Sequence, residues 1–111
     1  MNDYAISLDE IVSWLSAKKQ SLDSAGVLHA GVHHARVSNN PSAFADYDTD
    51  IGIGRISAWV SGEIDFHVLR RSDGKNVMME HLDVESLADP MLDHVFEKFL
   101  QTMANPDKAA I

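Results

Sequence analysis

The chain contains no cysteine, which excludes disulfide bonds and thiolate metal sites and agrees with a reducing compartment. No hydrophobic run approaches the roughly 18 residues of a membrane span. The first residues lack the basic start and the apolar core of a signal peptide. We therefore expect a soluble protein that is not exported, works in the cytoplasm and has no membrane partner.

Positive charge is also scarce. Nine lysines and arginines stand against 17 acidic residues, so the net charge at pH 7 is −8. Phosphate backbones repel a surface of this sign, and direct binding to nucleic acid is not expected. A basic protein partner would instead be attracted over long range. The same charge also serves solubility alone, so composition does not choose between the two roles.

Length and hydrophobic content are those of a globular protein. At 111 residues the chain fits one domain over 1–111, and 45% of its residues are hydrophobic. A chain of this length buries roughly two thirds of its unfolded surface, which is enough for a stable core without disulfides or a structural metal.

Both ends of the chain carry helix patterns. Ser7 and the glutamate three residues later form a capping box, so a helix is predicted over about 8–25, with Gly26 as its stop. Asp89 as cap and Pro90 as first residue start a second helix. Hydrophobic residues recur at the helical period in both segments. In the second helix they are Leu92, Val95, Phe96, Phe99, Leu100 and Met103.

Between the helices, alternating hydrophobicity and turn signals predict strands. They are expected at about 27–37, 43–50, 53–60, 63–70 and 75–83. Acids in the second of these segments would protect a sheet edge, so it is expected to be an edge strand. Short turns force sequential strands to be antiparallel. The expected fold is α+β: an antiparallel sheet of about four to five strands, with an N-terminal and a C-terminal helix packed on one face.

The third and fourth strands fold back on each other at Ser61-Gly62. A three-residue loop that pairs Val60 with Ile64 keeps all the hydrophobic residues of this hairpin on one side, so we prefer it to a two-residue loop. This register places Trp59 and Asp65 on the opposite, open face. Tryptophan is enriched at the energetic centres of protein interfaces, although packing against a neighbouring loop would equally explain Trp59.

Two clusters resemble metal sites at first sight. His29 and His33 are four residues apart, which on a strand is about 13 Å and too far for one ion. His33 and His34 would point to opposite faces. A shared metal site is therefore not expected among these histidines.

The run Asp46-Tyr47-Asp48-Thr49-Asp50 resembles the start of a calcium loop. Such a loop needs glycine at its sixth position and a glutamate at its twelfth, where this chain has Ile51 and Ser57. On a strand, however, all three aspartates would project to one side. They form either a solvated edge or an acidic patch for a partner.

Catalytic motifs are missing. Asp65 could join His67 or His81 as an acid–base pair, but no serine lies in a nucleophile elbow. Gly52-Ile53-Gly54 lacks the third glycine and the following helix of a dinucleotide site. We do not expect an enzyme, and no cofactor is indicated.

The central hairpin carries a resemblance to a known family. Its features are Trp14-Leu15 in the opening helix, the run Gly54-Arg55-Ile56-Ser57-Ala58-Trp59-Val60-Ser61-Gly62-Glu63-Ile64-Asp65, and the later Glu80-His81. Over residues 8–100 the chain resembles bacterial immunity proteins of the TriTu type, which look like the immunity partners of contact-dependent growth inhibition systems. These motifs are structural rather than catalytic.

The resemblance implies a function. A protein of this type would bind and neutralise a cognate toxin, a tRNA-cleaving nuclease that acts with elongation factor Tu, and a ternary complex with that factor is implied as one arrangement. A nuclease needs positive charge to hold RNA, and an acidic inhibitor complements it. No binding residue is carried over from the family, because immunity interfaces vary with their toxins.

Physical reasoning alone selects the candidate contact residues. The acids would steer and pair with lysines and arginines of the toxin, and the tryptophan would be an apolar anchor. The residues are Asp46, Asp48, Asp50, Trp59, Glu63 and Asp65. Two other roles stay open: a generic adaptor or homodimerising module that uses the open sheet face, and a small hydrolase built on Asp65 and a histidine.

Overall fold

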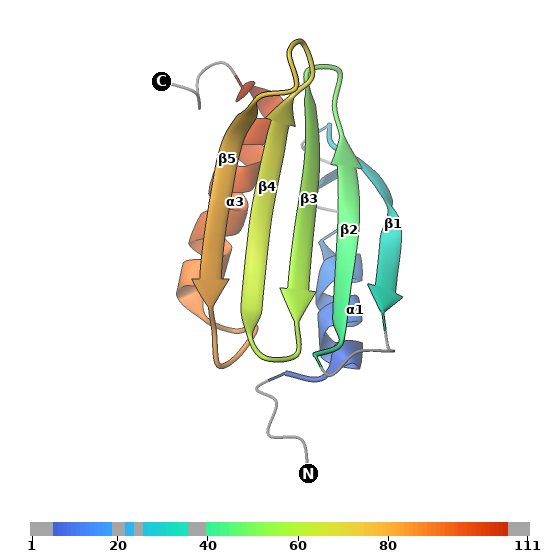
Figure 1. Ribbon diagram of the computed structural model, residues 1–111, viewed down its shortest axis with the longest axis vertical. Coiled ribbons are helices and arrows are strands. Elements are labelled where there is room, and N and C mark those ends of the chain that lie inside the picture. Colours follow the sequence, from blue (N-terminus) through green and yellow to red (C-terminus); the bar gives the residue numbers. More distant parts are fainter. Residues whose placement is uncertain (1–5, 19–21, 24–25, 36–39, 107–111) are drawn as a thin grey trace.

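The chain forms a five-stranded antiparallel sheet with its two long helices packed against one face (Figure 1). The computed structural model describes residues 6–18, 22–23, 26–35 and 40–106. In chain order the elements are α1 (Leu8–Ala17), β1 (Leu28–Ala35), β2 (Ser42–Asp48), β3 (Gly52–Trp59), β4 (Glu63–Arg70), β5 (Asn76–Asp83) and α3 (Pro90–Ala104). The α+β class and the antiparallel sheet predicted from the sequence are confirmed.

The strands follow one another across the sheet in chain order, from β1 to β5. The prediction that the 43–50 segment is an edge strand is wrong, because β2 lies between β1 and β3 and pairs with both. Its residues alternate strictly between buried and half-buried. The acids of β2 therefore lie on the open face of the sheet and do not guard an edge.

The β3–β4 hairpin keeps the predicted faces but not the predicted partners. Ala58 pairs with Ile64 and Ile56 pairs with Phe66, whereas the expected register paired Ala58 with Phe66. The difference is two residues, and a shift of two preserves which face each side chain occupies. The hydrophobic residues of both strands consequently remain on the helix-covered side.

The turn at 60–62 explains the shift. Val60 leaves the β3–β4 ladder, because its N–H donates to the carbonyl of Pro41 at 3.0 Å and its own carbonyl accepts from Ile6 at 3.2 Å. The N–H of Gly62 then donates to the carbonyl of Trp59 at 2.9 Å, and Gly62 has a φ of 99° that favours glycine. A tertiary contact of the backbone thus ends β3 at Trp59.

Both helices begin where the sequence predicts. The hydroxyl of Ser7 accepts from the N–H of Glu10 at 3.1 Å, and the Glu10 carboxylate accepts from the N–H of Ser7 at 3.3 Å, which completes the capping box. At α3, the carboxylate of Asp89 accepts from the N–H of Met91 at 2.9 Å, and proline occupies the first turn. Local sequence signals are sufficient to set both starts.

The end of the first helix was predicted less well. The helix was expected to continue to residue 25, but α1 ends at Ala17. Residues 19–21 and 24–25 of that prediction, and residues 36–37 of the predicted first strand, lie outside the described residues. Leu22 and Asp23 are helical as predicted, and the N–H of Leu22 donates to the carbonyl of Lys18 at 3.0 Å, so the prediction holds at these two positions beyond the end of α1.

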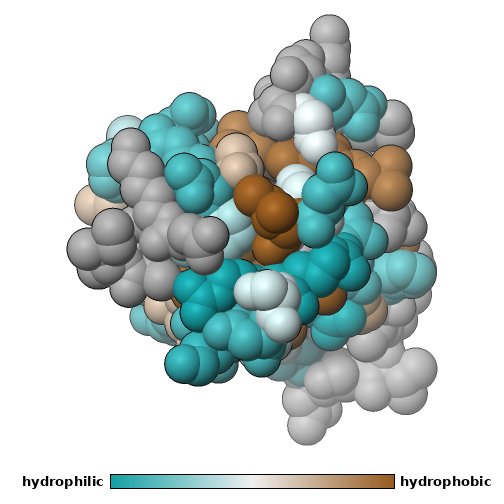
Figure 2. All heavy atoms as spheres, turned by 90° about the horizontal axis from the view of Figure 1, so that it is seen from above, coloured by the Kyte–Doolittle hydropathy of each residue, from teal (hydrophilic) through white to brown (hydrophobic). Residues whose placement is uncertain are grey.

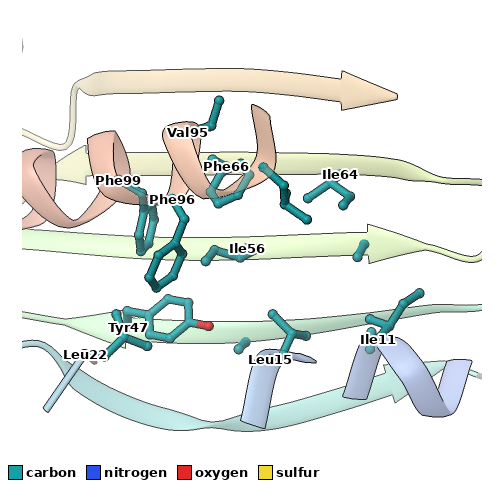
Figure 3. Packing of buried hydrophobic residues seen from close by; sticks show 14 of the residues in the cluster. Ile11, Leu15, Leu22, Tyr47, Ile56, Ile64, Phe66, Val95, Phe96 and Phe99 are labelled. Carbon is teal, nitrogen blue, oxygen red and sulfur yellow. The ribbon is translucent and has the colours of Figure 1, made fainter. Parts of the chain in front are cut away.

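The core lies between the sheet and the helices, and Phe99 of α3 is fully buried in it (Figure 3). The centroid of its ring lies 5.4 Å from that of Tyr47, 5.8 Å from that of Phe66 and 6.3 Å from that of Phe96. Burial raises the pKa of Tyr47, and the negative charge of Asp46 adds to this shift, so the Tyr47 hydroxyl stays neutral.

Gly54 allows α3 to approach β3 closely. A Cβ atom at this position would lie 2.7 Å from Cζ of Phe99 and 2.7 Å from Sδ of Met103. These separations are well below van der Waals contact, so the glycine is required for space and not for a turn. The Gly-Ile-Gly run that resembles part of a nucleotide motif is thus explained by core packing.

Candidate functional site

The face of the sheet that the helices leave uncovered is the candidate binding surface, and it faces the viewer in Figure 1. Along β3 and β4 its side chains alternate with the core residues. They are Ile53, Arg55, Ser57, Trp59, Glu63, Asp65, His67 and Leu69. The prediction that Trp59 and Asp65 share the open face is confirmed.

Four titratable side chains gather where the start of β4 meets the end of β5, at the lower end of the sheet in Figure 1. Glu63 is paired with Asp83 across the two strands, and Asp65 is paired with His81. We call these four residues the acidic corner. Directly paired residues have Cβ atoms about 5 Å apart, so their charges interact.

His81 lies between two carboxylates of the corner. Its Nδ1 is 2.5 Å from Oδ1 of Asp65, and its Nε2 is 3.4 Å from Oδ1 of Asp83. The hydrogen bond with Asp65 raises the pKa of His81, and the charges of Asp65 and Asp83 raise it further. The imidazole is therefore held in one orientation, although all three side chains are solvent-accessible.

Glu63 is held by neutral donors. Its Oε2 accepts from the hydroxyl of Ser61 at 2.9 Å and from the side-chain amide of Asn40 at 3.5 Å. The turn before Glu63 is bonded to the residue that follows β5, because the N–H of Val84 donates to the carbonyl of Gly62 at 2.8 Å. These contacts orient the Glu63 carboxylate without neutralising its charge.

The acids of β2 have positively charged partners. Nε and Nη2 of Arg55 donate to the two carboxylate oxygens of Asp46 at 2.7 and 3.1 Å, and the same guanidinium lies 4.3 Å from the centroid of the Phe44 ring. Asp48 forms an ion pair with Arg71. Much of the charge that the sequence assigned to an acidic patch is therefore balanced within the chain.

Asp50 does not share the strand face with the other two aspartates, so the prediction that all three project from one side of a strand is wrong. β2 ends at Asp48, and the hydroxyl of Thr49 accepts from the N–H of Gly52 at 2.9 Å to form the turn. Asp50 is exposed in this turn beside Ile51. Figure 2 views this end of the molecule, where hydrophobic surface is flanked by hydrophilic residues.

Trp59 ends β3 on the open face and is half-buried. It stands on one side of the turn at 60–62, and Glu63 stands on the other side as the first residue of β4. Its partner on β2 is Ser42, a small residue. Trp59 thus lies at the same end of the open face as the acidic corner.

Among the side chains that the structure describes, His67 and His81 do not form a catalytic set. The structure brings Asp65 and His81 together, as the sequence allowed, whereas His67 contacts the side chain of Asn76. A general base would use the second nitrogen of His81 to activate a nucleophile, but that Nε2 faces the carboxylate of Asp83. Within the described residues, no hydroxyl hydrogen-bonds to His81.

One group of metal-ligand type is found in the described part of the chain. One ligand atom each of Glu63, His81 and Asp83 lie within 4.8 Å of one another. All three side chains are accessible to water, and exposed acids are common without an ion, so we assign no metal. His33 is not in this group and stacks on Phe44, with 5.1 Å between the ring centroids.

The comparisons with known proteins identify the family. In the described residues, no helix is long and apolar enough to cross a membrane. The family model of immunity protein TriTu matches residues 9–102. The chain belongs to the TriTu family of immunity proteins. No curated protein matches the chain. Because an immunity protein acts by binding its cognate toxin, the open face of this TriTu protein is considered below as a protein-binding surface.

Sequence reasoning missed two residues of the corner. Asp83 was not considered, and His81 was considered for catalysis and as part of the family motif but not as a contact residue. The two residues are separated by one position in β5, which places both on the same face. That spacing could have indicated that His81 and Asp83 share a face, but their position opposite Glu63 and Asp65 depends on the β4–β5 register.

Substitution of Asp65 by asparagine is expected to lower the pKa of His81 towards that of a free histidine, because the main cause of the raised value is lost. Since this pKa is raised in the folded state, the associated stabilisation is complete below the unfolded pKa and disappears as the pH rises through the folded pKa. An NMR titration of the His81 ring protons measures the change. Asp46→Asn is the control, and an unchanged His81 titration in Asp65→Asn would contradict the assignment.

Proposed function

We propose that this TriTu protein neutralises a nuclease toxin that cleaves tRNA together with elongation factor Tu, by forming a tight complex with the toxin in the cytoplasm. The family match carries the proposal, because it covers most of the chain. A net charge of −8 supports a basic partner, and a domain that holds RNA presents lysines and arginines. Inhibition by binding needs no chemistry from this chain.

The proposed contact surface is the open face of the sheet with its two ends. It contains the candidate contacts Asp46, Asp48, Asp50, Trp59, Glu63 and Asp65. A specific interface of standard size buries about 1,200–2,000 Å² in total. In such an interface the aromatic residue contributes most to affinity, while accessible acids mainly accelerate association.

The test uses a purified candidate toxin domain, chosen from the genes next to that of this chain, with a tRNA substrate and elongation factor Tu. We expect that one equivalent of the immunity protein stops tRNA cleavage, and that the toxin and the immunity protein elute together in size-exclusion chromatography. Unabated cleavage in the presence of excess immunity protein would overturn the proposal. Cleavage and complex formation that are the same with and without the factor would remove only the ternary arrangement.

A further inference from the structure

We propose that the toxin docks on one end of the open face, with a lysine- or arginine-bearing segment on the acidic corner and an apolar contact on Trp59. The inference rests on the proposed function and makes it more specific, because it selects one end of the sheet. It also adds His81 and Asp83 to the contacts and gives the acids of β2 a secondary role.

The distribution of unbalanced charge favours the corner. The corner holds three carboxylates and one imidazole: His81 lies against Asp65 and Asp83, and Glu63 accepts only from neutral donors. Within the described residues, no lysine or arginine forms an ion pair with these carboxylates. By contrast, Asp46 and Asp48 each have an arginine partner. Because unpaired charges of one sign add up to a local field, the corner attracts a cationic segment more strongly than β2 does.

The corner is also arranged before any partner arrives. The hydroxyl of Ser61 and the amide of Asn40 orient Glu63, and the ring of His81 orients Asp65. Both carboxylates belong to β4, which pairs with β3 on one side and β5 on the other, and not to a loop. A preorganised acceptor loses less conformational entropy on binding, so more of the interaction energy appears as affinity.

A hollow beside the corner has the size of a side chain. It has a volume of about 220 Å³ and is lined by Asp65, His67, Met79 and His81, together with two flanking residues of β4 and β5. Pockets for small molecules usually measure about 300–1,000 Å³, so this one is better suited to a single residue of a protein. Met79, which is 69% exposed, offers apolar surface to the aliphatic stem of a lysine or arginine.

Charge reversal tests the location. In the full chain, Glu63→Lys with Asp83→Lys is compared with Asp9→Lys and Glu97→Lys, which change exposed residues of the helices that cover the opposite face of the sheet (Figure 1). Each reversal adds two charges, so both pairs take the net charge from −8 to −4. Affinity for the same toxin domain is measured by calorimetry and association rates by surface plasmon resonance, at two salt concentrations. Thermal melts verify folding.

We expect the corner pair to weaken binding by roughly a hundredfold, and the helix pair by less than about threefold. Glu63→Gln with Asp83→Asn serves as a second variant, because the amide carbonyl that replaces the Glu63 carboxylate can still accept from Ser61 and Asn40. This neutral pair should weaken binding about tenfold, and it keeps the test valid if the charge-reversed pair proves unstable. Trp59→Ala should also lose about tenfold or more, mainly through faster dissociation.

The outcomes separate the two proposals. If the wild-type protein does not bind the toxin, the proposed function fails. If it binds, and the corner variants bind equally well, the docking site is wrong while the function stands. Greater loss in Asp46→Asn with Asp48→Asn would move the site to β2. Sedimentation of the free protein tests whether a second copy of this chain binds the corner instead. A dimer that the corner variants dissociate would overturn the inference.

Discussion

Replacing Phe99 with alanine is expected to destabilise the protein by about 3–5 kcal/mol. The side chain is fully buried, and its ring contacts three other rings, those of Tyr47, Phe66 and Phe96. Removing it opens a cavity at the point where α3 crosses the sheet, and neighbours that belong to three different elements cannot collapse into it together. Small domains have a total stability of only about 5–15 kcal/mol, so the variant should be marginally folded.

Urea denaturation followed by tryptophan fluorescence measures this effect. Met91→Ala is the matched control, because Met91 lies on the same helix and is 52% exposed. Its midpoint should stay close to that of the wild type, since surface substitutions usually change stability by less than about 0.5 kcal/mol. Similar midpoints for the Phe99 and Met91 variants would contradict the packing role assigned to Phe99.

Gly54→Val is expected to cost about 1–3 kcal/mol by overpacking, even though valine is favoured in strands. The new side chain would overlap Phe99 and Met103, whose nearest atoms are each 2.7 Å from the position of a Cβ. Met103 is flexible and can move aside. The ring of Phe99 is confined by other aromatic rings, so it sets most of the cost.

A double-mutant cycle in urea identifies the cause. If the clash with the ring dominates, Phe99→Leu should partly relieve the effect of Gly54→Val, and the two changes should be non-additive by about 0.5–3 kcal/mol. Ser57→Val, on the same strand but on the open face, is the control for added bulk. Strict additivity of the Gly54 and Phe99 changes would contradict the packing explanation.

These two substitutions and the docking variants act on opposite faces of one sheet. Phe99 and Gly54 lie on the helix-covered side, and their substitution should lower the free energy of unfolding. Trp59 and Glu63 lie on the open side, and their substitution should be seen chiefly as reduced affinity for the toxin. A small binding protein can vary its open face for a new partner while the covered face keeps the fold.

Much of the fold could be read from local pattern. The starts of both helices follow from capping residues that bond to N–H groups within three positions of themselves. The open-face assignment of Trp59 survived a register error, because a strand repeats every two residues and the error was two. The edge position of β2 was predicted wrongly, since acids on an open face and acids on an edge have the same alternating pattern.

The candidate site was predicted in part for a related reason. The alternation of side chains along a strand was enough to place Trp59 and Asp65 on the open face. From the sequence alone, however, Asp46 and Asp48 were treated as unbalanced negative charge. Arg55 and Arg71 come from other parts of the chain, nine and 23 residues away, and balance them. Conversely, Asp83 lies 20 positions from Glu63 in the chain and opposite it in the sheet.

The sequence alone was thus enough to predict the α+β class, the buried face of each strand and the acidic character of the surface. These properties depend on helical and strand periods and on composition, which are local quantities. The location of the unbalanced charge came from the fold, because it depends on which strands become neighbours and on where Val60 leaves its ladder to bond with Pro41 and Ile6. Contacts between distant segments set those two features, and no single stretch of the chain contains them.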